Sequence, residues 1–358
     1  NMKLLFGSEP NSLEAWMRSR RDGTEEGYSE GMKLGFDWYI NQKNTLTLSY
    51  TGRGQNTISD HTVINNINLI DSMSYRSLDQ ITDGDRNGQF HTFSLNYQKK
   101  FNKPDQELMV DANWNIGRFN RESTQKIDYL NDMFDTDYAF DKKDVTKAND
   151  DRAVVKINYT HPFSKELRLE TGYNLNYSNR HSDYDYYFNG LSEKDTATSY
   201  VFHSTEYIHA LYATVGYTHG NWSGQLGLRG EIVRSTATKT MENKANTSFD
   251  KNYNPLFPTL HLSYQITPMQ SAQFSYSRRI NRPDMFSMMP NVDLSNPEHI
   301  RFGNPDIDPE YTNSLEIGYS HIFSKTTIFA SAYYRQTNNR ISWFNFLWTE
   351  ENARRYGF

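Results

Sequence analysis

The sequence lacks several features that would assign the protein to a common class. It contains no cysteine, which excludes disulfide bonds, thiol catalysis and thiolate metal sites. It has no apolar run of about eighteen residues, so a transmembrane helix is excluded. Basic residues are not in excess either, because the formal net charge is −5. Nucleic acid is therefore not an expected partner, since domains that bind it usually carry a basic stripe.

Signatures of catalysis and of metal binding are also missing. The ten histidines show no paired metalloprotease spacing, and both His161 and His261 lie within strand patterns. Neither a glycine-rich phosphate loop nor a Gly-x-Ser-x-Gly sequence is present. We therefore expect no enzyme activity, no catalytic or metal-binding residues and no cofactor.

Aromatic residues, in contrast, are abundant. Hydrophobic residues make up only 36% of the chain, yet aromatics reach 15%, with 25 Tyr and 21 Phe. Disordered chains are poor in aromatics, so this chain is expected to fold. Tyrosine and tryptophan suit the interface of a membrane, where one end of the ring is apolar and the other is wet. Composition alone leaves an ordinary secreted β-protein as an alternative.

Hydrophobic alternation with a period of two residues is clearest between Phe257 and Arg335. Two predicted hairpins, with turns at 267–270 and 324–327, flank a loop of almost thirty residues. Similar hairpins recur along the chain from Gly27, and together they predict twelve strands. Their short turns lie near these residues: Asn41, Pro104, Lys165, Trp222, Pro268 and Lys325. The long polar connections are expected at about 51–87, 120–150, 189–204 and 283–310.

This regular exchange of short and long connections is typical of an outer-membrane barrel, in which short turns face the periplasm and long loops face the exterior. A sandwich also shows alternating strands, but the predicted strand from Leu167 to about Asp185 is too long for one. In a barrel, one set of residues should face lipid and the other the lumen. The lipid-facing set includes Leu226, Leu262, Phe274 and Ile317, and the lumen-facing set includes Arg229, His261, Gln273 and Glu316.

Four segments in the second half of the chain carry a family resemblance. They are Tyr207–Ala213, Gly227–Glu231, Ser275–Pro283, and Gly303–Pro305 followed by Pro309–Glu310. In their order and spacing they resemble TonB-dependent outer-membrane receptors, and most closely the Bacteroidota-type outer-membrane β-barrel family. The hairpin rhythm extends this resemblance, less specifically, back to about Gly27.

The resemblance implies an all-β, antiparallel, up-and-down transmembrane barrel in the bacterial outer membrane. Family members have about 22 strands around an N-terminal plug and import bulky nutrients with energy delivered by TonB. We expect residues 1–358 to be a single barrel region with about 12–13 of those strands, residues 1–26 being hard to assign and the plug absent. The implied partners are outer-membrane lipid, an unknown nutrient ligand and, through the missing plug, the TonB complex.

The two ends of the sequence suggest a longer natural polypeptide. Residues 1–6 are too short for a signal peptide, which an exported protein requires. Residues 1–20 and 341–358 offer no convincing pair of strands to close a barrel, although 352–358 resembles the start of one. We expect the natural chain to start well before Asn1, with a plug, and to continue past Phe358.

Arg278, Arg279 and Arg282 form the main candidate site, because guanidinium groups pair bidentately with anionic ligands or lipopolysaccharide phosphates. The alternative is a structural role where the strand joins the loop. Alternation places Arg279 toward the lumen and Arg278 toward the lipid headgroups.

Two other segments are weighed in the same way. Pro and Gly residues in the loop 283–310 set its shape, with direct ligand contact as the alternative. The acidic segment Asn131–Asp137 lacks the glycine and terminal glutamate of a calcium loop, so we expect a solvated loop. The substrate-binding residues stay unassigned. A structural or adhesive surface protein is the alternative function, and a plug encoded upstream would favour the receptor.

Overall fold

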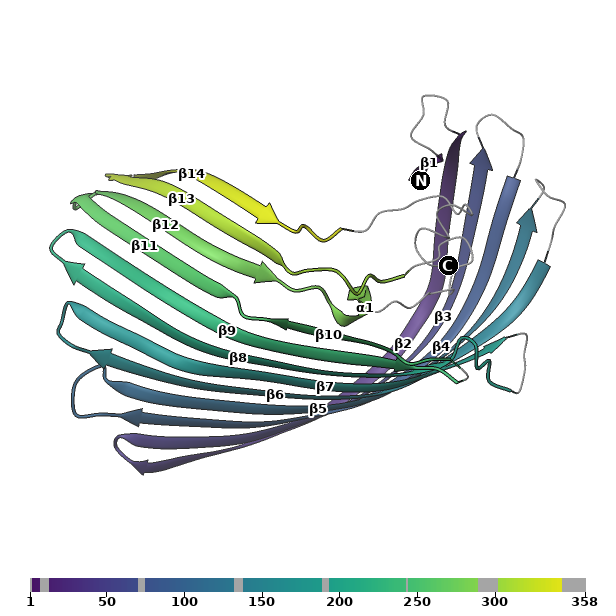
Figure 1. The fold of residues 1–358 in the computed structure, drawn as a ribbon, viewed down its shortest axis with the longest axis horizontal. Helices are drawn as coiled ribbons and strands as arrows, with labels where there is room; N and C mark the ends of the chain where they lie inside the picture. Colours follow the sequence, from purple (N-terminus) through teal and green to yellow (C-terminus); the bar gives the residue numbers. More distant parts are fainter. Residues whose placement is uncertain are drawn as a thin grey trace.

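The computed structural model describes residues 2–6, 13–69, 75–131, 138–188, 193–242, 244–288 and 302–342. These residues form one antiparallel sheet of 14 strands and one short helix, α1 (Met285–Met288) (Figure 1). The strands are β1 (Met2–Phe6), β2 (Leu13–Asn41), β3 (Asn44–Leu69), β4 (Tyr75–Lys100), β5 (Glu107–Asn131), β6 (Tyr138–Pro162), β7 (Leu167–Phe188), β8 (Tyr200–His219), β9 (Trp222–Thr240), β10 (Thr247–Tyr253), β11 (Leu256–Thr267), β12 (Gln270–Asn281), β13 (Glu310–Phe323) and β14 (Thr326–Asn338).

The order of the strands in the sheet follows their order in the chain, which confirms the up-and-down arrangement. The exception is β10, which pairs with the distal part of β9, whereas β11 pairs with the part of β9 nearer the turn. Among the described strands, β1 and β14 each have one partner, so this part of the sheet is not closed. Figure 1 shows the sheet curving around one concave face, with β14 and β1–β3 at its two sides.

All six predicted short turns lie at one end of the sheet, on the left in Figure 1, as expected for a barrel. Backbone hydrogen bonds link four of the five pairs of neighbouring turn regions. The nitrogen–oxygen distances are 2.8 Å for Lys100 to Lys43, 2.9 Å for Thr218 to Glu166, 2.8 Å for Gln265 to Asn221 and 2.8 Å for Ile322 to Met269. The six short turns therefore share one end of the sheet as predicted, but the connections at the other end are not all long, since only residues 70–74 join β3 to β4 and 132–137 join β5 to β6.

Two of the predicted long loops were wrong. The segments 51–87 and 120–150 consist mostly of the distal parts of β3, β4, β5 and β6, and only 70–74 and 132–137 lie outside the described residues. Both faces of these distal parts carry polar side chains, so the sequence shows no hydrophobic alternation there. The strands continue because their backbone groups pair in an unbroken ladder.

The predicted strand set was incomplete as well. The twelve expected strands are present, and β1 and β10 bring the number to 14. The first 26 residues, which are hard to assign from the sequence, contain β1 and the first part of β2. The strand expected at 352–358 lies outside the described residues.

The register confirms the predicted division into two faces. Leu262, Phe274 and Ile317 are direct partners across β11, β12 and β13, and Leu226 lies on the same face through its partner Leu260. On this convex face Leu211 is 68%, Leu226 62% and Ile317 61% exposed. Such a broad exposed apolar surface is unfavourable in water and suits the hydrocarbon of a bilayer. Among the described residues, the structure contains no helix with the length and apolarity to span a membrane.

Candidate functional site

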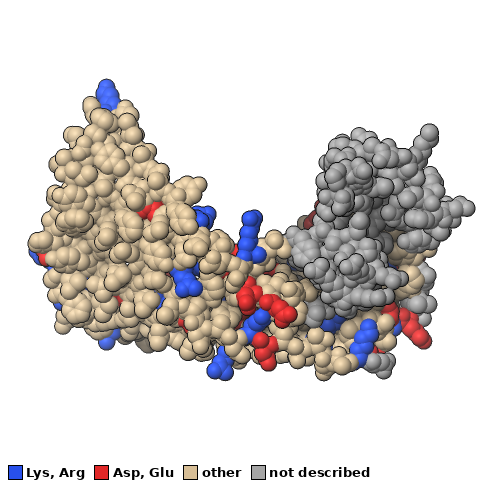
Figure 2. Space-filling model, turned by 45° about the horizontal axis from the view of Figure 1, so that its top comes forward, with Lys and Arg blue, Asp and Glu red and all other residues tan. Residues whose placement is uncertain are grey.

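The concave face of the sheet holds the residues predicted to face the lumen. Arg229 of β9 pairs with Phe257 of β11. Phe257, Thr259 and His261 alternate along β11 and share one face, so Arg229 lies on the same face as His261. Gln273 and Glu316 join the same face through their partners Ser263 and Ser275. In the view of Figure 2 the turn end of the molecule, on the left, shows few charged side chains, and most of them lie nearer the middle.

The described ends of the connection between β12 and β13 lie against this concave face. We call residues 282–309 the strap, of which 282–288 and 302–309 are described. Met285 packs against Phe202 and Ala237, and its sulfur lies 3.8 Å from the hydroxyl of Ser235. This small cluster buries apolar surface on the lumen side of β8 and β9. The described start of the strap is therefore packed against the wall.

An ion pair at the start of the strap joins it to the wall. Glu231 accepts from Nε of Arg229 at 2.8 Å and from the guanidinium of Arg282 through its other oxygen. The side chain of Glu231 is only 6% exposed. A buried carboxylate is costly without partners, and here two guanidinium groups compensate it.

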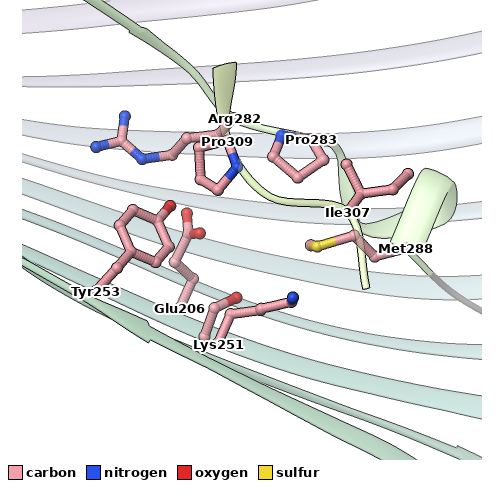
Figure 3. A pocket seen from close by; sticks show the side chains of 9 residues that line it. Glu206, Lys251, Tyr253, Arg282, Pro283, Met288, Ile307 and Pro309 are labelled. Carbon is pink, nitrogen blue, oxygen red and sulfur yellow. The ribbon is translucent and has the colours of Figure 1, made fainter. Parts of the chain in front are cut away.

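A small cavity lies between the strap and the wall (Figure 3). Its wall side is lined by Glu206, Ser235, Lys251 and Tyr253, and its strap side by Arg282, Pro283, Met288, Ile307 and Pro309. The volume of about 20 Å³ is enough for roughly one water molecule. This cavity is therefore a seam between two packed parts of the chain and is too small for a nutrient.

The three candidate arginines do not form one cluster. Arg282 pairs with Glu231 in the strap. The register places Arg279 on the lumen face, beside Thr312, and Arg278 on the convex face, beside Asn313. The guanidinium carbon of Arg278 lies 4.8 Å from the centroid of the Tyr311 ring. These orientations agree with the predicted alternation, and the contacts of Arg282 are those of a residue that joins strand and strap.

The other candidate positions show no metal site within the described part of the chain. No group of three or more His, Asp or Glu residues that could hold a metal occurs there. His261 lies on the lumen face, whereas His161 lies on the convex face with its Nδ1 2.9 Å from the hydroxyl of Tyr159. Of the acidic segment 131–137, residue 131 ends β5 and the remainder lies outside the described residues.

Sequence analysis missed the residues that β10 contributes. Lys251 and Tyr253 face the lumen beside Ser235 and Val233 of β9. The sequence does contain a short alternating pattern that could have indicated β10, in which Phe249, Lys251 and Tyr253 alternate with Asp250 and Asn252. The lysine interrupts the apolar face of this pattern, which makes it weak. Lys251 also reaches the strap, with Nζ 3.8 Å from a carboxylate oxygen of Asp308.

The distal end of β9 holds a buried cation. From Arg234 onward the convex side of β9 is polar, so this part of the strand lies beyond the apolar belt. Lys239 is buried on the lumen side with Nζ 4.7 Å from the ring centroid of Tyr200. Burial, followed by repulsion from Lys244, lowers the pKa of Lys239 below its ordinary value.

Comparison with solved structures shows the same architecture in outer-membrane receptors. The ferric yersiniabactin uptake receptor of Yersinia pestis matches with a TM-score of 0.51 and 11% identity over 89% of this chain and 54% of the receptor. The alcaligin outer-membrane receptor of Bordetella pertussis has a TM-score of 0.49 and 13% identity over 91% and 51%. A siderophore receptor of Acinetobacter baumannii has a TM-score of 0.48 and 11% identity over 92% and 57%.

Identities this low establish a shared fold alone, and of these three matches only the first is close enough to support it. The chain spans about half the length of these receptors. No curated protein sequence matches the chain. A family model matches directly, however, and covers residues 99–355, which is well over half of the sequence. The chain therefore belongs to the outer membrane protein beta-barrel family and forms part of a barrel in the bacterial outer membrane.

Proposed function

We propose that this chain forms part of the barrel wall of a TonB-dependent receptor that takes up a bulky or scarce nutrient. The observation that carries the proposal is the length of the strands. A tilted strand needs about 9–11 residues to cross the hydrocarbon core, whereas β2 has 29 and β5 has 25 residues. The additional length forms a polar wall on the side away from the short turns, where a ligand arriving from outside would first make contact.

The role of this wall would be passive. Lumen-facing polar side chains and the connections at the distal end would recognise the ligand, and the apolar convex face would hold the barrel in lipid. A plug, contributed by a segment other than the described sheet, would be displaced by TonB to open a path. This division of labour needs no catalytic group in the wall. It rests on the family resemblance and on the similar folds of known uptake receptors.

Deletion of the natural gene tests the proposal. Cells lacking it should lose energy-dependent uptake of at least one compound in a panel of radiolabelled iron chelates, corrinoids and oligosaccharides. Uptake should return with a plasmid copy of the gene, and it should fail again when TonB is deleted. Unchanged uptake of the whole panel, together with lost attachment of the cells to surfaces or to other cells, would support the adhesive alternative instead.

A further inference from the structure

Three arginines on the concave face of β3, β4 and β5 have no anionic partner among the residues that the structure describes. Arg53 faces Phe90 across β3 and β4, and Arg86 faces Arg121 across β4 and β5. Alternation places all three on the lumen side, because each lies an odd number of positions along its strand from a residue of the convex face, namely Tyr50, Phe93 or Trp114. Within the described part of the chain, none of the three guanidinium groups makes an ion pair or a hydrogen bond.

This arrangement is unfavourable for the empty wall. Arg86 and Arg121 are directly opposite, so their Cβ atoms are about 5 Å apart, and like charges in such a pair destabilise a sheet. Several described lumen residues lie directly opposite or diagonal to the three arginines. Among them the only acidic residue is Asp144, which is diagonal to Arg121. Nearby, in contrast, Arg152 is bidentate to Asp150, at 2.9 and 2.6 Å.

A cavity of about 430 Å³ lies at this place, within the usual range for small-molecule sites. It is lined by Thr51, Arg53, Gln55, Arg86, Phe90 and Thr92. The Phe90 ring lies along the wall over two glycines, since a Cβ at Gly88 would be 2.8 Å and one at Gly117 3.3 Å from it. The cavity thus combines two cationic forks, three neutral polar groups and an apolar floor.

The height of the cavity makes it reachable from outside the cell. Tyr50, Phe93 and Trp114 form a row of rings on the convex face, with centroids 5.1 and 6.0 Å apart, as at a membrane interface. Arg53 and Phe90 lie three residues farther from the short turns than this row, and Arg86 lies farther still. The site is therefore level with, or beyond, the outer edge of the apolar belt.

We propose that this surface is a binding subsite for a small polyanion that presents carboxylate or phosphate groups to Arg53, Arg86 and Arg121 and rests its organic part on Phe90. Guanidinium groups bind both kinds of oxyanion bidentately, and a bound anion would also relieve the repulsion between Arg86 and Arg121. The proposal rests on the proposed receptor function, because it names the chemical class of ligand that the outer part of the lumen would take.

Calorimetry on the receptor expressed from its natural gene, in lipid nanodiscs, tests the subsite with two probes, ferric citrate for carboxylates and inositol hexakisphosphate for phosphates. Loss of a charged hydrogen-bonding partner should weaken binding about tenfold for each of R53Q and R86Q. The matched control is R335Q, which removes an exposed lumen-facing guanidinium on β14. The probe that binds more tightly identifies the kind of oxyanion.

A folding control accompanies these measurements. Because R86Q removes a like-charge contact, its thermal unfolding should occur at the same or a higher temperature than that of the wild type. Binding of neither anion by the wild type, equal binding by wild type and R53Q/R86Q, or an equal loss in R335Q would each overturn the proposal. The binding test and the uptake test can fail independently. If deletion of the gene left uptake unchanged while anion binding still depended on Arg53, the receptor function would be wrong and the anion subsite would stand.

Discussion

Glu231 is a buried carboxylate that joins the lumen wall to the start of the strap. Its carboxylate is buried and receives hydrogen bonds from Arg229 on its own strand and from Arg282 at the start of the strap. Removal of one member of a buried ionic group costs more than the group contributes as a whole, because the remaining charges lose their partners. The two arginines are only partly buried, so water can compensate for part of that loss.

The E231Q variant should therefore be destabilised by about 2 kcal/mol, because charge-assisted hydrogen bonds to two guanidinium groups are replaced by weaker neutral ones. The change in the free energy of unfolding is measured by urea titration of the receptor in detergent. The folded fraction is read from the difference in gel mobility between heated and unheated samples. A double-mutant cycle with R282Q provides the control. Strictly additive losses would show that Glu231 and Arg282 are not coupled.

At the scale of the element, each strand has two faces with opposite requirements. On β11 the outward residues Leu260 and Leu262 alternate with the inward residues His261 and Ser263. Substitutions one position apart along the same strand should therefore differ greatly in their consequences. On β9 the apolar alternation ends at Ile232, and the convex face is polar from Arg234 onward.

Leu262→Arg should cost about 2–4 kcal/mol if the residue lies near the middle of the bilayer, because a charge would then face hydrocarbon. His261→Arg is the matched control, since it places the same side chain on the wet face of the same strand. The amount of folded receptor in outer-membrane fractions measures both effects. Equal assembly of the two variants would contradict lipid exposure of Leu262.

At the scale of the whole molecule, the sheet has an orientation. The six short turns gather at one end and the distal strand ends and the segment 193–199 at the other (Figure 1). In outer-membrane barrels the short turns face the periplasm. Polar strand extensions on the opposite side would then project into the medium.

Cysteine labelling tests this orientation, and the described chain contributes no cysteine of its own. A membrane-impermeant maleimide should label Glu193→Cys in intact cells, because this residue lies in the connection at the distal end. Lys165→Cys, in a short turn, should react only after the outer membrane is permeabilised. Labelling of Lys165→Cys in intact cells, with protection of Glu193→Cys, would reverse the assigned orientation.

The sequence by itself determined the hairpins, their turns and the faces of the strands. This was possible because the apolar belt imposes a strict two-residue period wherever one face meets lipid and the other meets water. Leu226, Leu262, Phe274 and Ile317 were assigned to one face for that reason, and the register confirms each of them. The resemblance in the second half of the chain led to the family that the comparison with known families then established.

Only the tertiary structure decided where strands extend beyond the belt and which charges meet. In the distal parts of β3 to β6 neither face is consistently apolar, so the period disappears although the hydrogen-bonded ladder continues. Arg282 and Glu231 are 51 positions apart and meet only because the strap folds back onto the wall. Arg86 and Arg121 are neighbours through the register of two strands, and no local pattern encodes that register where neither face is apolar.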